Sequence, residues 1–251
     1  MPDSTNLTAI VLCKNAESTL SHCLASLDFC EHIIVGDDGS IDESLLIARK
    51  FHADIIKISP GLDFAQKRNY LLEYAKNEWV FYVDADEIVT SQLATNIQNQ
   101  IRTTDAKGFY VRRMDVLFGK KLQYGETAHT WLLRVARRNS GHWKRPVHEI
   151  WQVSGKLDRL EGELLHYSHP DLEEFMDKIN TYTDSETQER VKNHISKTSA
   201  YIQLFLFPVG KFMQNYIVRL GFLDGFSGFV MAWMMSLHSL CVRIKIIEKI
   251  A

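Results

Sequence analysis

The stretch Glu78-Trp79-Val80-Phe81-Tyr82-Val83-Asp84-Ala85-Asp86 carries the strongest structural signal in this sequence. Its short apolar run of aromatic and β-branched residues ends in two carboxylates, which is the pattern of a buried strand that meets solvent. Carboxylates in this place suit a hard divalent cation that takes its remaining ligands from phosphate groups and water. We therefore predict that Asp84 and Asp86 bind Mg²⁺ or Mn²⁺. The alternative is that these acids, with Glu87, favour the N-terminus of a following helix.

Strands and helices alternate on the N-terminal side of this stretch. The pattern predicts strands at residues 7–13, 33–36 and 54–58, and helices at 18–27, 42–51 and 64–75. Strands that are apolar throughout and joined by helices predict an α/β fold, with a mostly parallel sheet flanked by helices. Ligands of such sheets bind at the carboxyl ends of the strands, where Lys14-Asn15, Asp37-Asp38 and Asp84-Ala85-Asp86 stand. We expect these three clusters to form one site.

The alternation ends near Lys107. Residues 108–113 and 131–136 are predicted strands without a helix between them, and residues 172–193 are a predicted helix. Two apolar helical stretches follow Ser199, and we expect breaks at Pro208 and at residues 221–228. The chain is therefore predicted to contain a sheet domain, residues 1–170, and a helical C-terminal extension, residues 171–251.

The composition of the chain indicates its cellular compartment and the kinds of partner that it can bind. The chain has 251 residues and a formal net charge of −2, so we expect no nucleic-acid partner. Its four cysteines form no Cys-x-x-Cys pair, which predicts reduced thiols in a reducing compartment and no zinc site. The first six residues lack the basic and apolar regions of a signal peptide. The predicted location is the cytoplasm.

The C-terminal region adds a membrane hypothesis. The segment from Gly225 to Val242 contains no Lys, Arg, Asp or Glu, but it is at the lower limit of a membrane span and includes polar residues. A peripheral or packed helix is therefore the favoured interpretation. Residues 205–247 are aromatic and basic, which suits contact with the cytoplasmic face of an anionic inner membrane. A layer packed on the sheet domain or on another subunit is the alternative.

The order of these motifs resembles that of the family 2 glycosyltransferases, which are nucleotide-sugar enzymes with the Rossmann-like GT-A fold. The matching pieces include Ile10–Glu17, Asp37-Asp38-Gly39-Ser40, Phe64–Asn69, Asp84-Ala85-Asp86 and Arg145-Pro146-Val147-His148-Glu149. Leu165-His166-Tyr167-Ser168 and residues 219–229 are similar to the lipopolysaccharide-core β-glycosyltransferases, so the resemblance covers nearly the whole chain. It implies inverting transfer of a sugar from a nucleotide diphosphate, expected to be UDP, to a hydroxyl of a glycan or glycolipid such as lipopolysaccharide core.

The resemblance also implies roles for single residues. Asp38 is expected to contact the nucleoside. Glu149 is expected to deprotonate the acceptor hydroxyl, a task suited to a carboxylate in a pocket that substrate closes. His148 is expected to orient Glu149 or to contact the acceptor, and His166 to be a further metal ligand. Other residues expected to line the donor site are Asn15, Glu17, Asp37, Lys67, Asn69 and Asp84.

Each role has a structural alternative. Ser40 or Asp42 could cap the helix that follows them, Glu149 could form an ion pair with Arg145, and His166 could be a buried core residue. A group of basic residues without an acid could be a solvated loop or a site for an anionic acceptor or diphosphate: Arg134, Arg137, Arg138, Lys144 and Arg145.

Three other functions compete with sugar transfer to a glycan. A polyprenyl-phosphate sugar synthase of the same fold is the main one, and the segment Arg145–Glu149 argues against it. A nucleotidyltransferase needs similar carboxylates but usually carries a glycine-rich phosphate loop, whereas Lys14–Glu17 contains no glycine. A non-catalytic protein with this fold has no need of intact acidic motifs together with Glu149.

Overall fold

The computed structural model describes residues 6–145, 149–167 and 197–250, with several further positions between 175 and 190. The chain divides into two compact units, one formed by Met1–Arg113 and Trp131–His166, the other by Met114–Thr130 and Tyr167–Ala251. The predicted domains, 1–170 and 171–251, stay a prediction, since the two units describe packing and not independent folding. Most of the helix predicted at 172–193 lies outside the described residues.

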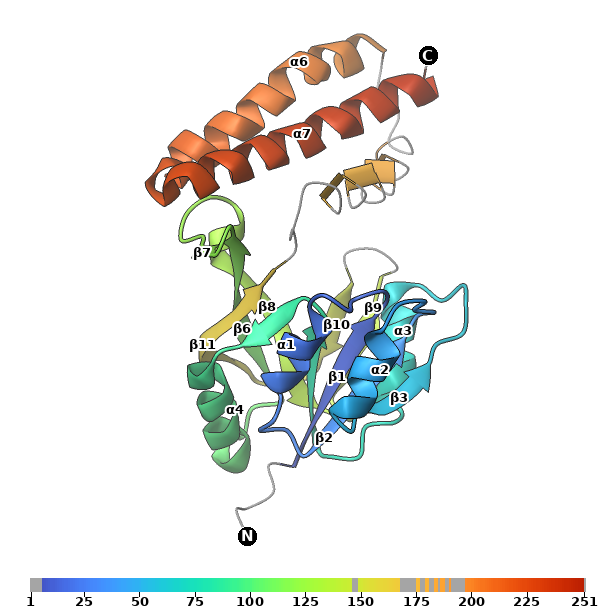
Figure 1. Ribbon diagram of the computed structural model, residues 1–251. Helices are drawn as coiled ribbons and strands as arrows, with labels where there is room; N and C mark the ends of the chain where they lie inside the picture. The colour runs from blue at the N-terminus through green and yellow to red at the C-terminus, as the bar shows by residue number, and fades with distance from the viewer. Residues whose placement is uncertain are drawn as a thin grey trace. The chain divides into compact units, whose positions relative to one another are not determined.

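A mixed sheet organises the first unit (Figure 1). Its strand order is β3-β2-β1-β4-β8-β6-β11-β5. These strands are β1 (Leu7–Cys13), β2 (His32–Asp37), β3 (Asp54–Lys57), β4 (Trp79–Asp84), β5 (Glu87–Val89), β6 (Gly108–Leu117), β8 (Thr130–Arg137) and β11 (Leu157–His166). The first four in spatial order run parallel, whereas β8 is antiparallel to β4 and β11 is antiparallel to β5. The predicted α/β fold is confirmed, and its parallel half is the N-terminal one.

Two hydrophobic cores cover the two faces of this sheet. The helices are α1 (Leu20–Ala25), α2 (Ser44–Lys50), α3 (Phe64–Leu72) and α4 (Ser91–Thr103). Ala9 and Val11 of β1 pack in the core that includes residues of α1, α2 and α4. Ile10, between them, packs in the other core, with α3 and the hairpin of β9 (Gly141–Lys144) and β10 (Ile150–Val153). Because alternate side chains point to opposite faces, burial on both faces requires strands that are apolar throughout.

Helix α3 is fixed at its start and packed closely against β2. Asp63 caps it: Oδ1 accepts a hydrogen bond from the amide of Gln66 (2.8 Å), and the Gln66 side chain accepts one from the amide of Asp63 (2.9 Å). Gly36 in β2 lets the helix approach, because an added Cβ would overlap the side chain of Leu71. This approach places Lys67 within reach of Asp38 at the end of β2.

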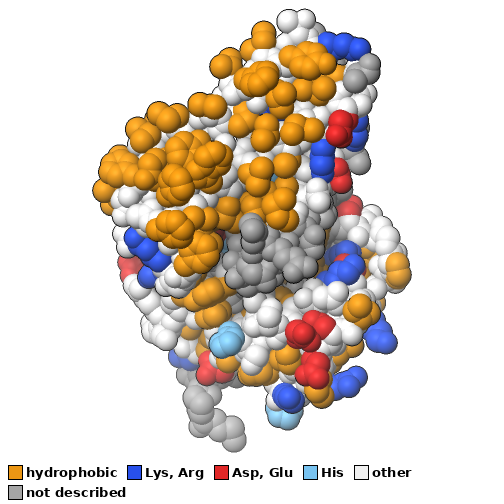
Figure 2. Space-filling view, turned by 45° about the horizontal axis from the view of Figure 1, so that its top comes forward, with side chains coloured by type: hydrophobic (Ala, Val, Ile, Leu, Met, Phe, Trp, Pro, Cys, Tyr) orange, Lys and Arg blue, Asp and Glu red, His pale blue; other side chains and the backbone are white. Residues whose placement is uncertain are grey.

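A helical hairpin dominates the described part of the second unit. Helix α6 (Lys197–Met213) continues through the π-helical turn Gln214–Val218 and the 3-10 turn Gly221–Asp224 into α7 (Gly225–Ile250), which lies beside α6 (Figure 1). The short strand β7 (Lys120–Lys121) pairs with the end of β6, and the 3-10 turn Thr127–His129 precedes β8. Exposed apolar side chains gather over the hairpin (Figure 2).

The predicted break at Pro208 is wrong, because Pro208 lies inside α6. Proline removes one backbone hydrogen bond, but Pro208 is buried in a helix that packs along α7. The break predicted at residues 221–228 is displaced, since the irregular turns occupy residues 214–224 and α7 begins at Gly225.

Candidate active site

The carboxyl ends of three strands meet at one edge of the sheet. β1 lies between β2 and β4, with Cys13 paired to Asp37 on one side and Leu12 paired to Asp84 on the other. From β1 the chain continues to β2 and β3 on one side and then returns to β4 on the other side. The strand order therefore reverses at β1, and open α/β sheets bind ligands at such a topological switch point. The polar clusters that follow β1, β2 and β4 are therefore neighbours.

Asn15 and Glu17 link the loop after β1 to the loop after β2. Oδ1 of Asn15 accepts a hydrogen bond from the amide of Ile41 (2.9 Å), and Oε2 of Glu17 accepts one from the amide of Glu43 (3.0 Å). The amide of Glu17 in turn donates to Oδ2 of Asp42 (3.0 Å). Asn15 and Glu17, both predicted to line the nucleotide-sugar site, thus hold the two loops together through hydrogen bonds to backbone amides.

The neighbouring acids Asp37 and Asp38 have different environments. Asp37 is buried, and its Oδ1 accepts a hydrogen bond from the amide of Ser40 (2.8 Å), which fixes the turn. Asp38 is only half-buried, and Nζ of Lys67 lies 2.7 Å from its Oδ2. The cap expected from Ser40 or Asp42 is wrong, because Glu43 is the N-cap residue of α2 and its side chain makes no capping hydrogen bond. Asp42 Oδ1 instead accepts a hydrogen bond from the amide of Ser44 (3.0 Å), two residues on. Asp38 is therefore the acid of the pair that remains accessible to a ligand.

Asp84 lies in a network of two arginines and a second acid. Nη2 of Arg68 is 2.9 Å from Oδ1 of Asp84, and Nη2 of Arg134 is 2.6 Å from Oδ2. Arg134 also pairs with Glu87 at 3.0 Å, while the amide of Asp84 donates to Oε2 of Glu87 (2.9 Å). The four side chains come from α3, β4, β5 and β8.

Burial raises the pKa values of Asp84 and Glu87, whereas the nearby arginines lower them. Burial disfavours ionised Asp84, but the guanidinium groups of Arg134 and Arg68 outweigh it and hold the pKa of Asp84 far below its usual range. Burial dominates at Glu87 and raises its pKa, with the charge of Arg134 opposing and that of Asp84 adding to the rise. The pKa of Arg134 is raised by Asp84 and Glu87 despite its burial. Arg134 therefore stays charged and keeps Asp84 ionised.

Glu149 reaches the same network through Arg68. Its Oε1 lies 3.2 Å from Nη2 of Arg68, so the ion pair observed is with Arg68 and not the one considered with Arg145. The guanidinium of Arg68 lies over the ring of Trp143, 4.6 Å from its centroid. Asn69 bonds the backbone of Trp143 twice, at 2.9 and 2.8 Å, which joins α3 to β9. His148, the other predicted catalytic residue, lies outside the described residues.

Asp86 and His166 form the remaining candidate metal pair. Oδ2 of Asp86 is 3.7 Å from Nε2 of His166, and both side chains are partly accessible, at 24% and 14%. Their strands are joined, because His166 of β11 is paired to Glu87 of β5. Ligand atoms of one octahedral ion at about 2.1 Å lie roughly 3 Å apart, so a modest adjustment fits this pair to Mg²⁺ or Mn²⁺.

The third predicted ligand, Asp84, is engaged elsewhere, since both of its oxygens contact guanidinium groups. Within the described parts of the chain, no group of three or more His, Cys, Asp or Glu residues is arranged to hold a metal. An ion held by Asp86 and His166 therefore needs further ligands from a bound phosphate or from water.

The predicted basic group separates into buried and exposed members. Arg134 is 4% exposed inside β8, so a solvated loop is the wrong description of it. Arg137 pairs with Glu78 and lies over the ring of Trp79, and Arg138 donates to the carbonyl of Ala75. Two members, Lys144 and Arg145, are exposed and remain available to an anionic ligand. The five basic residues between positions 134 and 145 therefore do not form a single binding surface.

Glu87 and Arg134 are the site residues that sequence reasoning misplaced. Glu87 does not begin a helix: it is fully buried in β5, and α4 begins at Ser91, with Thr90 as its cap. A signal was present in the apolar run of residues 131–136, where the single charge of Arg134 calls for a buried acid.

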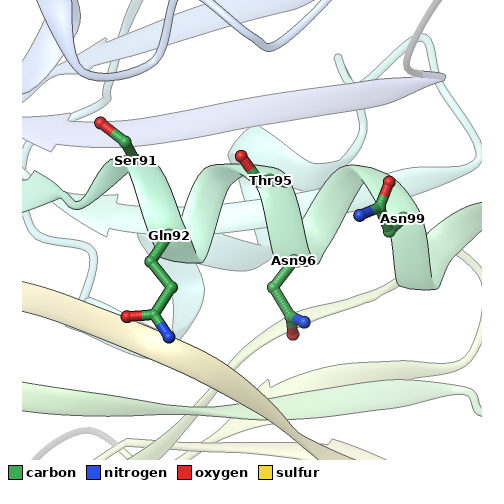
Figure 3. A pocket seen from close by; sticks show the side chains of 5 residues that line it. All are labelled: Ser91, Gln92, Thr95, Asn96 and Asn99. Atoms are coloured by element: carbon green, nitrogen blue, oxygen red, sulfur yellow. The ribbon is translucent and has the colours of Figure 1, made fainter.

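A shallow hollow lies on the surface of α4 (Figure 3). Its lining consists of uncharged polar side chains: Ser91, Gln92, Thr95, Asn96 and Asn99. Oδ1 of Asn96 accepts a hydrogen bond from the amide of Glu161 (3.0 Å), so part of this lining serves packing against β11. None of the predicted site residues lines it, and the switch point remains the candidate site.

An α/β sheet with acids at its switch point is the architecture of a protein that binds its ligand at the strand ends. The sequence model described as glycosyl transferase family 2 matches residues 8–153. The chain belongs to this family and is a glycosyltransferase with the GT-A fold, as the sequence predicted.

Two relatives and one solved structure show the extent of the similarity. The lipopolysaccharide core biosynthesis glycosyltransferase LpsC of Rhizobium meliloti (strain 1021) is 25% identical, over 97% of this chain and 92% of its own. An uncharacterized glycosyltransferase of Rickettsia typhi is 21% identical, over 89% of this chain and 80% of its own. The glucosyl-3-phosphoglycerate synthase of Mycobacterium tuberculosis, solved with Mn²⁺, uridine diphosphate and phosphoglyceric acid, is 14% identical, with a TM-score of 0.48 over 69% of this chain and 73% of that one.

Proposed function

We propose that this glycosyltransferase moves a sugar, with inversion, from a UDP-sugar to a hydroxyl of a glycan or glycolipid of the lipopolysaccharide-core type. One observation carries the proposal. Arg68 lies 2.9 Å from Asp84, at the switch point, and 3.2 Å from Glu149, the proposed base, so donor-side and acceptor-side carboxylates share one guanidinium. The similarity to LpsC along nearly the whole chain supports the acceptor class.

The donor side uses the strand ends. Asp38, held by Lys67, is placed to accept hydrogen bonds from the nucleoside. Asp86 and His166 would hold Mg²⁺ or Mn²⁺, which neutralises charge on the leaving diphosphate when it is bound. Since both oxygens of Asp84 contact arginines, we assign Asp84 to orienting Arg68 and Arg134 and not to direct metal ligation.

The acceptor side uses Glu149. Its carboxylate takes the proton of the acceptor hydroxyl as that oxygen bonds to the anomeric carbon, and the bond from that carbon to the diphosphate oxygen breaks. Attack from the face opposite the leaving group inverts the anomeric configuration. Arg68, which is buried between Glu149 and Asp84, holds the carboxylate in place.

We infer that the enzyme acts on the cytoplasmic face of the inner membrane, where a lipid-linked acceptor is found. In the described part of the chain, the segment Gly221–Ile250 is the one helix long and apolar enough to cross a membrane by length and composition. About two fifths of its most apolar window, 39%, is buried within the protein, which favours contact with the membrane over a crossing.

The direct test is a donor screen followed by a transfer assay. UDP-sugars with Mn²⁺ should raise the melting temperature more than GDP- or TDP-sugars, because ligands stabilise the folded state. The selected donor should then glycosylate a purified core glycolipid, with an inverted anomeric centre by NMR. Transfer to polyprenyl phosphate in its place would identify a polyprenyl-phosphate sugar synthase, and absence of transfer to any acceptor would contradict the proposal.

A further inference from the structure

The α6–α7 hairpin places polar residues inside and large apolar residues outside. Its buried polar residues, each at most 7% exposed, are Asn215, Asp224, Ser227, Ser236, Ser239 and Arg243. Large apolar residues with 56–74% exposure are Phe205, Leu206, Val209, Val218, Phe226 and Trp233. Figure 2 shows apolar side chains gathered over this surface. A helical layer that faces water has the opposite arrangement.

Several of the buried polar groups find hydrogen-bond partners inside the second unit, whereas Nε of Arg243 has none among the described residues. The hydroxyl of Ser236 donates to the carbonyl of Pro208 (2.8 Å), across the two helices, and the hydroxyl of Ser227 donates to the carbonyl of Leu117 (3.2 Å). Oδ2 of Asp224 accepts hydrogen bonds from two consecutive amides, those of Gln123 and Tyr124, each at 2.9 Å. These polar groups therefore do not depend on water.

Small residues allow close contact at the turn of the hairpin. An added Cβ at Gly228 would overlap the carbonyl oxygen of Gly221, and one at Gly221 would lie 2.7 Å from the carbonyl oxygen of Asn215. Small residues, interhelical hydroxyl hydrogen bonds and large apolar side chains on the outside are together the pattern of helices packed in lipid.

The hairpin also has a polar side, which argues against a crossing. Lys211 pairs with Glu126 (2.6 Å) and Lys245 with Asp184 (2.8 Å), both within the second unit. Met231 and Met234 of α7 pack in a cluster with Phe175 and Ile179. One side of the hairpin is thus covered by protein and by ion pairs, and the other is apolar and exposed. Such an element lies in the plane of the membrane interface.

Charge favours an anionic surface. Residues 197–250 contain six Lys or Arg and only two acids, Asp224 and Glu248. Asp224 and Arg243 are buried, and Lys211 and Lys245 form ion pairs within the second unit. The exposed basic residues are Lys197, Arg219 and Lys249. Basic groups beside an apolar face gain from the negative surface potential of anionic lipids. A continuous exposed apolar surface of this extent is also unusual for a soluble monomer.

We propose that the exposed apolar face of the α6–α7 hairpin inserts into the acyl–headgroup boundary of an anionic membrane and anchors the enzyme with both helices in the membrane plane. The inference extends the membrane location of the proposed function by naming the surface and its mode of insertion. It concerns lipid binding alone, so it stands or falls separately from sugar transfer.

Vesicle flotation tests the surface. The full chain should float with phosphatidylcholine vesicles that contain phosphatidylglycerol, and less with phosphatidylcholine alone. The double variant Phe205→Ser, Val209→Ser should weaken binding by about tenfold or more, because it removes two exposed apolar side chains from α6. The matched control Leu46→Ser alters an apolar side chain with 45% exposure on α2 and should bind like the wild type. Equal binding by the double variant and the control overturns the proposal.

Quenching of Trp233 tests the depth and the orientation. Lipids brominated near the headgroup should quench its fluorescence more than lipids brominated near the chain ends, and Trp233→Phe should lose this response. Stronger quenching from the bilayer centre would indicate a crossing helix and overturn the in-plane anchor.

A stable dimer that does not bind vesicles would overturn the proposal and assign the face to a second copy of the chain. The Phe205, Val209 double variant should keep the circular dichroism spectrum and the melting temperature of the wild type, so a general loss of folding is recognised.

Discussion

Nη2 of Arg134 lies 2.6 Å from Oδ2 of Asp84, and the same nitrogen lies 3.0 Å from Oε1 of Glu87. The guanidinium of Arg134, in β8, thus lies between the side chains of the last residue of β4 and the first residue of β5. The first acid of the Asp84-Ala85-Asp86 motif is therefore part of the framework of the site, while the second is directed to His166.

Removing Arg134 should destabilise the fold. Arg134→Met leaves Asp84 and the fully buried Glu87 without their shared partner, and loss of one member of a buried ion pair costs about 3–5 kcal/mol. Urea unfolding measures the change in the free energy of unfolding. The control Lys156→Met breaks the exposed pair with Asp105 (2.9 Å) and should leave that free energy nearly unchanged. Similar effects of the two substitutions would contradict the framework role of Arg134.

The depressed pKa of Asp84 predicts a loss of stability in acid. Asp84 stays ionised in the folded chain at a pH where an unfolded aspartate, with a pKa of about 3.9, binds a proton. The unfolded state then binds more protons, so the free energy of unfolding falls as the pH falls below about 4. Glu87 acts in the opposite direction, because its raised pKa makes protonation favour the folded state.

Urea unfolding of the wild type and of Asp84→Asn over a pH series measures the effect. The difference in unfolding free energy should be largest near neutral pH and shrink below pH about 4. A difference that stays constant with pH would contradict the depressed pKa. NMR titration of the Asp84 carboxyl carbon provides a second measurement without a substitution.

The proposed metal site uses Asp86 and His166 as ligands, and not Asp84. Asp86→Ala should weaken Mn²⁺-dependent binding of the donor by at least about tenfold, and His166→Ala should have the same kind of effect. Asp105→Ala, an exposed acid, is the matched control. Calorimetric titration of the donor with and without Mn²⁺ measures each affinity. Unchanged Mn²⁺ dependence in Asp86→Ala would remove Asp86 from the proposed ligands.

Glu149→Gln should separate transfer from donor binding. Loss of a general base lowers kcat by about 10²–10⁴-fold, while the amide keeps the size of the side chain and the dissociation constant of the donor stays close to that of the wild type. The control Glu161→Gln changes an exposed acid of β11. Single-turnover transfer and donor titration together give both constants. Wild-type turnover by Glu149→Gln would show that another group is the base.

Local patterns predicted the N-terminal sheet well. Apolar strands at 7–13 and 79–83 could be read because both of their faces are buried, and Asp38 and Asp84 because they directly follow such strands. The parallel pairing of β1 with β2 and β4 then brings those ends together.

Contacts between distant residues could not be read in the same way. Arg134 and Glu87 are 47 positions apart, so the apolar run around Arg134 indicates a buried acid but does not identify Glu87 as that acid. Asn69 was expected to line the donor site, yet its side chain bonds the backbone of Trp143, and the neighbouring Arg68 is buried. Their positions follow from how α3 and β8 pack on the sheet, which local periodicity does not encode.

Three consecutive residues of α3 each contact a different part of the site. Lys67 bonds Asp38 after β2, Arg68 bonds both Asp84 and Glu149, and Asn69 bonds the backbone of Trp143 in β9. A single helical turn thus supports both Asp38, the proposed nucleoside contact, and Glu149, the proposed base. Changes that tilt α3 should therefore raise the donor KM and lower kcat together, even when they touch neither substrate.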